Sequence, residues 1–136
     1  MVIDQVKADI EDWLINFVEV PHPALGNWPP CPFARQSRLR NKYDVRLGTD
    51  VERDLFLFAK KHYLGKNDVV IFAYAPDQYD DAYFNWAVDT MNMSKGFRKR
   101  NLLALADHPD LVETHNGVCF NIINWTTRFR SNIVSW

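Results

Sequence analysis

The stretch VVIFAYA, residues 69–75, is an almost unbroken apolar run near the middle of the chain. It is short and rich in β-branched and aromatic residues, which favours a strand over a helix. A strand with one wet face would alternate apolar and polar side chains, and this run does not alternate. The sequence therefore predicts a central strand that is covered on both faces, as in α/β sheets flanked by helices.

The segment before this run predicts a strand followed by a helix. Residues 43–47 alternate in the manner of a strand. Thr49 and Glu52 have the spacing of a capping box, in which the Thr49 side chain accepts from the first helical turn and Glu52 reaches back. The helix that follows has apolar residues on one face, and Gly65 suits its C-terminal end. That apolar face consists of Val51, Leu55, Phe58 and Ala59.

The N-terminal segment predicts an amphipathic helix, because apolar residues recur there at helical spacing with acidic residues between them. They are Ile3, Val6, Ile10, Trp13, Leu14 and Phe17. Pro21 and Pro23 are expected to end this helix, since proline cannot continue its hydrogen bonds. Residues 21–34 then form a proline-rich loop with several apolar side chains. We expect that loop to pack on the domain.

The segment after the central run predicts a helix, a short strand and a final strand. Pro76-Asp77 is a turn, and a helical face follows it. Its members are Tyr79, Ala82, Tyr83, Trp86, Ala87 and Thr90. Residues 102–106 and 118–125 read as strands, with a strong turn signal at Asn116-Gly117. The predicted fold is a single α/β domain with a mixed, mostly parallel sheet of about four strands and helices packed on it. The last strand is expected to pair antiparallel at an edge.

Composition narrows the class of protein. The chain has 136 residues, 47% of them apolar, which suits one globular domain. A formal net charge of −1 favours neither nucleic acid nor an anionic membrane as a partner. No apolar run approaches the roughly 20 residues of a membrane-spanning helix. Two cysteines and an N-terminal segment with three acidic residues before Asp12 argue against secretion, so a cytoplasmic location is expected.

Cys31 is the first candidate for chemistry. Pro30 and Pro32 flank it and restrict the backbone on both sides. Arg35 and Arg38 follow closely, and positive charge favours a thiolate where it is also near in space. The alternative is a structural cysteine in a packed loop, which is the commoner case for a single cysteine, and the sequence leaves both interpretations open.

Asp107 and His108 form the second candidate. They stand where the strand over residues 102–106 ends, and ligands of open α/β sheets collect beyond the carboxyl ends of strands. Asp107 could orient the imidazole of His108 or accept a hydrogen bond from a ligand. The alternative is a His-Pro turn that is capped by its own aspartate.

Known motifs contribute little. The sequence contains no glycine-rich phosphate loop, no nucleophile elbow and no zinc-ligand spacing, so no metal or cofactor is identified. Cys31-Pro32 also fits haem binding, but a two-residue motif occurs often by chance. Basic residues at 35–46 and 95–100 could hold phosphate or carboxylate groups, although such clusters are commonly solvated faces.

The Trp13 helix and the segment Cys31-Pro32-Phe33-Ala34 resemble the bacterial family known as domain of unknown function 1415. Members of that family have an apolar strand and, later, a strand that ends in a His-Pro pair, matched here by His108-Pro109. The chain departs from the family in the inserted segment 21–30 and in Asp107, where an aromatic residue is expected. The resemblance implies that Cys31 and His108 share one site, and it implies no reaction.

Two functions follow as hypotheses. In the first, a small enzyme or ligand-binding domain uses Cys31 as nucleophile or soft ligand and His108 as the acid–base group, with Asp107 beside it. Its small anionic ligand would be held by Arg35 and Arg38, beside Trp28. In the second, a non-catalytic adaptor binds a protein partner through exposed aromatic residues. The candidates for that surface are Trp28, Tyr79, Tyr83 and Trp136.

Overall fold

The computed structural model describes residues 2–61, 65–75, 77–107, 112–115, 118–121 and 132–135, with Asp107 and the last three ranges described by backbone alone. Its main sheet has the strand order β1-β2-β6-β3. The bounds are β1 Tyr43–Leu47, β2 Val69–Tyr74, β3 Leu105–Asp107 and β6 Asn132–Ser135. A separate antiparallel pair consists of β4 (Val112–His115) and β5 (Val118–Asn121).

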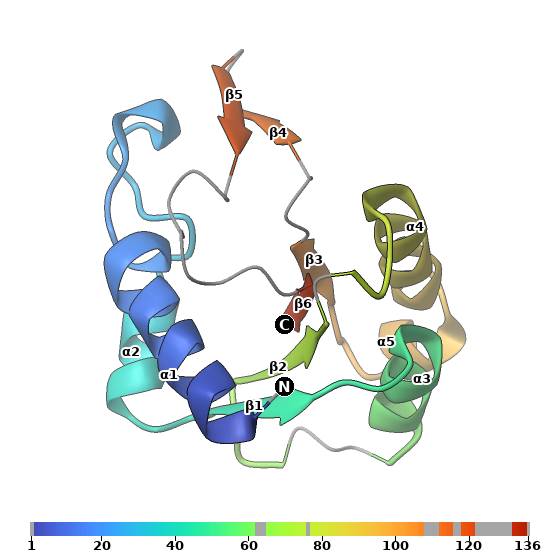
Figure 1. Ribbon diagram of the computed structural model, residues 1–136. Helices are drawn as coiled ribbons and strands as arrows, with labels where there is room; N and C mark the ends of the chain where they lie inside the picture. The colour runs from blue at the N-terminus through green and yellow to red at the C-terminus, as the bar shows by residue number, and fades with distance from the viewer. Residues whose placement is uncertain are drawn as a thin grey trace.

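Helices cover both faces of this sheet (Figure 1), so the chain folds in three layers. On one face lie α1 (Ile3–Trp13), which continues as a π-helix over Leu14–Val18, and α2 (Ala34–Leu39). On the other face lie α3 (Val51–Lys61), α4 (Asp81–Asn92) and α5 (Lys95–Lys99). A short 3-10 helix, Pro23–Leu25, lies in the proline-rich loop.

Strand β2 divides the core in two, because every one of its residues is buried. Val69, Ile71 and Ala73 pack into a cluster with the apolar face of α1 and the π-helix. Val70, Phe72 and Tyr74 pack into a second cluster with α3, α4 and Phe97 of α5. The alternation follows from the two-residue period of a strand. The prediction of a central strand covered on both faces is confirmed.

The pairing pattern corrects part of the predicted topology. The α/β class and the mixed sheet are confirmed: β1 pairs parallel with β2, and β3 runs in the same direction, because β2 and β3 each pair antiparallel with β6. Strand β6 pairs antiparallel with both β2 and β3, and therefore lies inside the sheet rather than at its edge. The strand predicted at residues 118–125 is described over Val118–Asn121 (β5). It pairs antiparallel with β4 in a separate sheet, so its predicted place at an edge of the main sheet was wrong. Local periodicity carries no information on strand order, which depends on where the chain returns.

Two local predictions also need correction. The helix α3 is capped by Asp50, whose Oδ1 accepts from the Arg53 N–H at 2.9 Å. Asp54 accepts in return from the N–H groups of Thr49 and Asp50, at 2.9 and 3.2 Å. The capping box predicted at Thr49 and Glu52 is therefore replaced by a cap in which Asp50 and Asp54 bond the backbone N–H groups around the helix start. The helix α2 and the strands β4 and β6 were not predicted, because each is short and has no clear periodicity.

Candidate functional site

Cys31 lies at the junction between the proline-rich loop and α2. It is half-buried and packs against the apolar cluster under α1. Its N–H donates to the Val18 carbonyl at 3.2 Å, which fixes the loop to the end of the π-helix. Burial raises the pKa of the thiol above its usual value, although hydrogen bonds from the amides of Phe33 and Ala34 act in the opposite direction. The thiol is therefore protonated at neutral pH.

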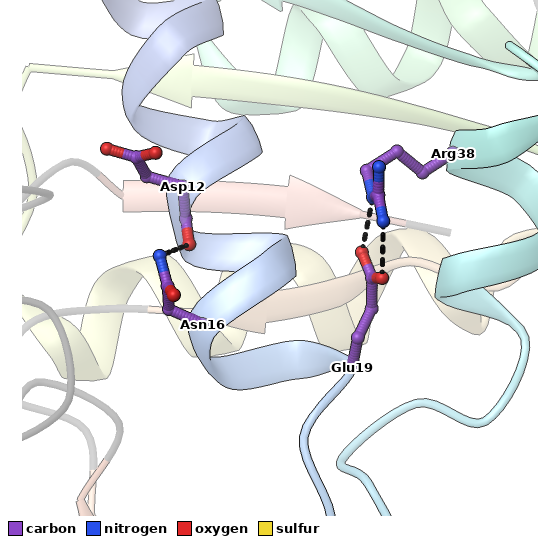
Figure 2. A network of polar contacts seen from close by, with 4 residues as sticks. All are labelled: Asp12, Asn16, Glu19 and Arg38. Atoms are coloured by element: carbon purple, nitrogen blue, oxygen red, sulfur yellow. Dashed lines mark hydrogen bonds and ion pairs between the residues drawn. The ribbon is translucent and has the colours of Figure 1, made fainter.

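Arg38 binds a carboxylate of its own chain (Figure 2). Its Nε and Nη2 atoms donate to the two oxygens of Glu19, at 2.7 and 2.9 Å. Only 18% of the Arg38 side chain and 6% of the Glu19 side chain are exposed. This bidentate ion pair clamps α2 to the residue that follows the π-helix. The predicted role of Arg38 as a ligand-binding cation is not supported, because its guanidinium already forms an ion pair with the Glu19 carboxylate.

The same figure shows a polar contact on the adjacent turn of the N-terminal helix. Asn16 Nδ2 donates to the backbone carbonyl of Asp12 at 2.9 Å. This residue lies within the π-helical segment, where Glu19 N–H reaches back five residues to the Leu14 carbonyl at 2.9 Å. π-Helical turns are often found at functional sites. Here the π-helical segment ends at Val18, which binds Cys31 of the proline-rich loop, and the next residue, Glu19, pairs with Arg38 of α2.

The remaining predicted site residues are not brought together by the described part of the chain. Arg35 and Trp28 are both exposed, and Trp28 keeps 65% of its surface accessible. Asp107 ends β3, where its backbone pairs with Ile133. The side chain of Asp107 and the whole of His108 lie outside the described residues. The shared thiol–imidazole site thus stays a prediction.

His22 is a residue that sequence reasoning passed over. It is buried, with 4% of its surface exposed, although it lies in the proline-rich loop. Its Nε2 atom lies 3.3 Å from the Phe17 carbonyl, and its ring lies 5.2 Å from the Phe17 ring. Its backbone also pairs with that of Trp28. No sequence signal could have identified this burial, because the path of the loop creates it.

A network of tyrosines joins the carboxyl end of β2 to the start of α3. The hydroxyl of Tyr74 donates to Asp54 Oδ2 at 2.9 Å, and the Tyr79 oxygen accepts from the Val51 N–H at 3.0 Å. The rings of Tyr74 and Tyr79 meet edge to face, with centroids 5.7 Å apart. These contacts satisfy the helix start and fill the edge where ligands of α/β sheets usually bind.

The outer side of α3 and α4 carries exposed aromatic residues, which we call the α3–α4 surface. Tyr83 and Trp86 are exposed by 38% and 55%, and their rings lie 5.8 Å apart. The Tyr83 hydroxyl donates to Glu52 Oε1 at 2.5 Å, which connects the two helices. Phe56, exposed by 55%, is four residues after Glu52 and so shares its side of α3. The α3–α4 surface comprises Glu52, Phe56, Tyr83, Trp86 and Asp89.

A groove of about 540 Å³ lies between α1 and the start of β1. Its polar lining includes acidic side chains on both elements and one lysine. The lining residues are Asp4, Lys7, Ala8, Glu11, Asn41, Tyr43, Asp44, Val45 and Asn67. The pKa of Tyr43 is raised by burial and by the nearby carboxylate of Glu11. None of the predicted site residues lines this groove.

A scan of protein-family models, a search of curated proteins and a search of solved structures found no match to this chain. The resemblance to domain of unknown function 1415 therefore stays a prediction. Within the described ranges, no three side chains of the metal-binding types lie close enough together to hold a metal ion. No helix in those ranges has the length and apolar character needed to cross a membrane.

Proposed function

We propose that the protein is an interaction module that binds another protein through the α3–α4 surface. The observation that carries this proposal is the exposure of Trp86, more than half of whose surface is open to solvent beside the exposed Tyr83. Tryptophan and tyrosine dominate the energetics of protein interfaces, because they bury large area and lose few rotamers. Tyr83 is also held in place by Glu52, so less of its freedom is lost on binding.

The charges around the Tyr83 and Trp86 rings favour a partner segment that contains arginine or lysine beside apolar residues, whereas the Phe56 ring already faces Lys60, whose Nζ lies 5.8 Å from its centroid. Glu52 lies next to Tyr83, and Asp89 lies one helical turn from Trp86. Asp80 and Asp81 stand at the start of α4. Aromatic faces attract cations, and carboxylates pair with them at the rim. An acidic partner would meet like charge here and bind weakly.

Site-specific photo-crosslinking in the cells that make the protein tests this proposal. A photoreactive phenylalanine at position 86 is expected to give one discrete protein adduct, and Asp89→Lys in the same chain is expected to weaken it. The matched control places the photoreactive group at Trp28, which is 65% exposed against 55% for Trp86 and lies on the proline-rich loop. An absence of adducts at position 86, or the same adducts from both positions, would overturn the proposal.

The thiol site is the second candidate, and the amides of Phe33 and Ala34 that face the Cys31 sulfur favour it. In this proposal Cys31 acts with His108 and Asp107, and Arg35 holds a small anionic ligand. The test is the rate of thiol alkylation against pH in a Cys119→Ser background. A Cys31 pKa that rises further on His108→Ala supports the shared site, whereas an unchanged pKa removes His108 from it.

Three broader expectations from the sequence are kept alongside this proposal. The chain is taken as one α/β domain, its sheet as having about four strands, and its location as the cytoplasm. The first two rest on the apolar strand at residues 69–75 with its flanking helices, and the third on the low cysteine content.

A further inference from the structure

Strand β1 lies at an edge of the sheet and turns half of its backbone groups away from β2. The Gly48 N–H donates to Ala73 at 2.8 Å, and the Lys42 carbonyl accepts from Asp68 at 2.7 Å. Backbone groups alternate in direction along a strand, so the even-numbered residues face β2. The N–H and C=O groups of Tyr43, Val45 and Leu47 therefore point outward. An edge of this kind is a template for another strand.

The side chains next to this edge carry opposite charges two residues apart. Asp44 Oδ1 accepts from the outward N–H of Val45 at 2.9 Å, and Asp44 Oδ2 accepts from Arg46 Nε at 3.0 Å. Both side chains remain about a third exposed, at 38% for Asp44 and 34% for Arg46. In the single chain, this pair covers the centre of the edge.

We propose that two copies of the chain associate through antiparallel pairing of their β1 strands, centred on Val45. The sequence Tyr-Asp-Val-Arg-Leu is self-complementary about that residue. In this register Asp44 stands directly opposite the partner's Arg46, on the face that carries α3. The outward groups of Val45 exchange hydrogen bonds with the partner's Val45, and those of Tyr43 do so with the partner's Leu47.

On both faces of the new strand pair, the side chains that meet are complementary. Val45 and Tyr43 lie on the α1 face, where they belong to the first apolar cluster. Leu47, exposed by 38%, shares that face and would be covered by the partner's Tyr43. On the other face, opposite charges stand in close non-hydrogen-bonded pairs, which stabilise antiparallel strands. A two-fold axis generates both sets of contacts from one patch, as in closed symmetric dimers.

The groove between α1 and β1 gives access to this edge. The partly exposed Tyr43 and Asp44 line it beside the buried Val45, so an incoming chain reaches the first half of the strand once the Asp44 carboxylate turns away from the Val45 N–H. Pairing replaces the bond from Val45 N–H to Asp44 with one to the partner's Val45 carbonyl. The freed carboxylate then turns from Arg46 of its own chain to the partner's Arg46. The contact that covers the edge in the single chain thus becomes the contact that selects the second copy.

A charge-complementation experiment tests this register by light scattering and analytical ultracentrifugation. The wild-type chain is expected at twice its mass of 15.9 kDa. Asp44→Lys and Arg46→Asp each place like charges opposite each other and are expected to weaken the dimer at least about tenfold. A mixture of the two single variants restores opposite charges at both positions and is expected to form a heterodimer.

Two further variants serve as controls for this experiment. The double variant with Asp44→Lys and Arg46→Asp is self-complementary again and is expected to dimerise as the wild type does. Asp77→Lys changes the net charge as Asp44→Lys does, but it lies on the loop after β2 and is expected to have no effect. A wild-type chain that remains at 15.9 kDa up to about 1 mM overturns the proposal. So does a dimer that both folded single variants retain.

Discussion

Gly48 lies directly against the buried ring of Tyr74: a Cβ atom added at Gly48 would stand 2.1 Å from Tyr74 Cε1. Gly48 follows β1, and Tyr74 ends β2, so the two residues meet at the carboxyl end of the parallel pair. The missing side chain lets the ring fit beneath the turn into α3, where its hydroxyl bonds to Asp54. The glycine is therefore required by close packing.

Gly48→Ala is expected to lower the free energy of unfolding by about 3 kcal/mol, because the added methyl group overpacks a fully buried ring. Urea denaturation measures this. Gly96→Ala is the matched control, since its Cβ would lie 3.4 Å from the Ala59 Cβ, an ordinary contact. That variant lies in α5 and is expected to be neutral or to stabilise by up to about 1 kcal/mol. Equal effects of the two variants would contradict the packing argument.

Arg38→Ala is expected to destabilise the fold by about 2–3 kcal/mol, because it leaves the buried Glu19 carboxylate without its partner. Arg35→Ala changes an exposed arginine on the same helix and is expected to stay within about 0.5 kcal/mol of the wild type. Thermal or urea unfolding distinguishes the two. A stable Arg38→Ala protein would show that α2 does not need this clamp.

Asp50→Ala is expected to cost about 1 kcal/mol, the usual effect of losing an N-cap side chain. Thr49→Ala is expected to cost less than about 0.5 kcal/mol, since the Thr49 hydroxyl makes only a 3.4 Å contact with Asp54. Denaturation curves of both variants decide between the observed cap and the one predicted from the sequence. If Thr49→Ala has the larger effect, the helix begins a residue earlier in solution.

The Tyr83–Glu52 bond is expected to give the protein a pH dependence above neutrality. The hydrogen bond to Glu52 raises the pKa of Tyr83 from 10.0 to about 12. The unfolded chain therefore ionises first, and the stability from this bond is present below pH 10 and is lost as the pH rises towards 12. Tyr83→Phe is expected to flatten this decline, measured by urea unfolding at each pH.

The carboxylate can be tested separately. Glu52→Gln is expected to move the pKa of Tyr83 back towards 10.0, which the NMR shifts of the Tyr83 ring report directly. The pKa of Tyr74, raised mainly by burial and next by Asp54, is expected to stay well above its usual value in that variant. If Glu52→Gln leaves the pKa of Tyr83 unchanged, the bond between Tyr83 and Glu52 does not persist in solution.

The sequence predicted those elements whose signal is local. The helix at residues 3–17, the strand at 43–47, the helix from Val51 and the buried strand at 69–75 follow from the spacing of their apolar side chains. The short helix α2 was not predicted, because six residues are too few to show the helical spacing of apolar side chains. The cap of α3 was misplaced by one residue because Thr49 and Asp50 are both good capping residues.

The candidate site was harder to predict, since it depends on which side chains meet. Adjacent arginines favoured an anion site near Cys31, yet Arg38 pairs with Glu19, a residue 19 positions away. The exposure of Trp86 and the burial of His22 likewise depend on which segments of the chain pack against them. Helical spacing placed Trp86 with Tyr83 on one face, but nothing in the spacing said whether that face was covered.

By itself, the sequence determined that β2 is a central strand and that α1 and α3 each bury one face, because hydrophobic periodicity is fixed by residues a few positions apart. Only the tertiary structure decided that β1 lies at an edge, that Arg38 is neutralised and that Gly48 makes room for Tyr74. Each of these depends on contacts between segments far apart in the chain. Such contacts are set by strand order and chain path, and no local pattern encodes them.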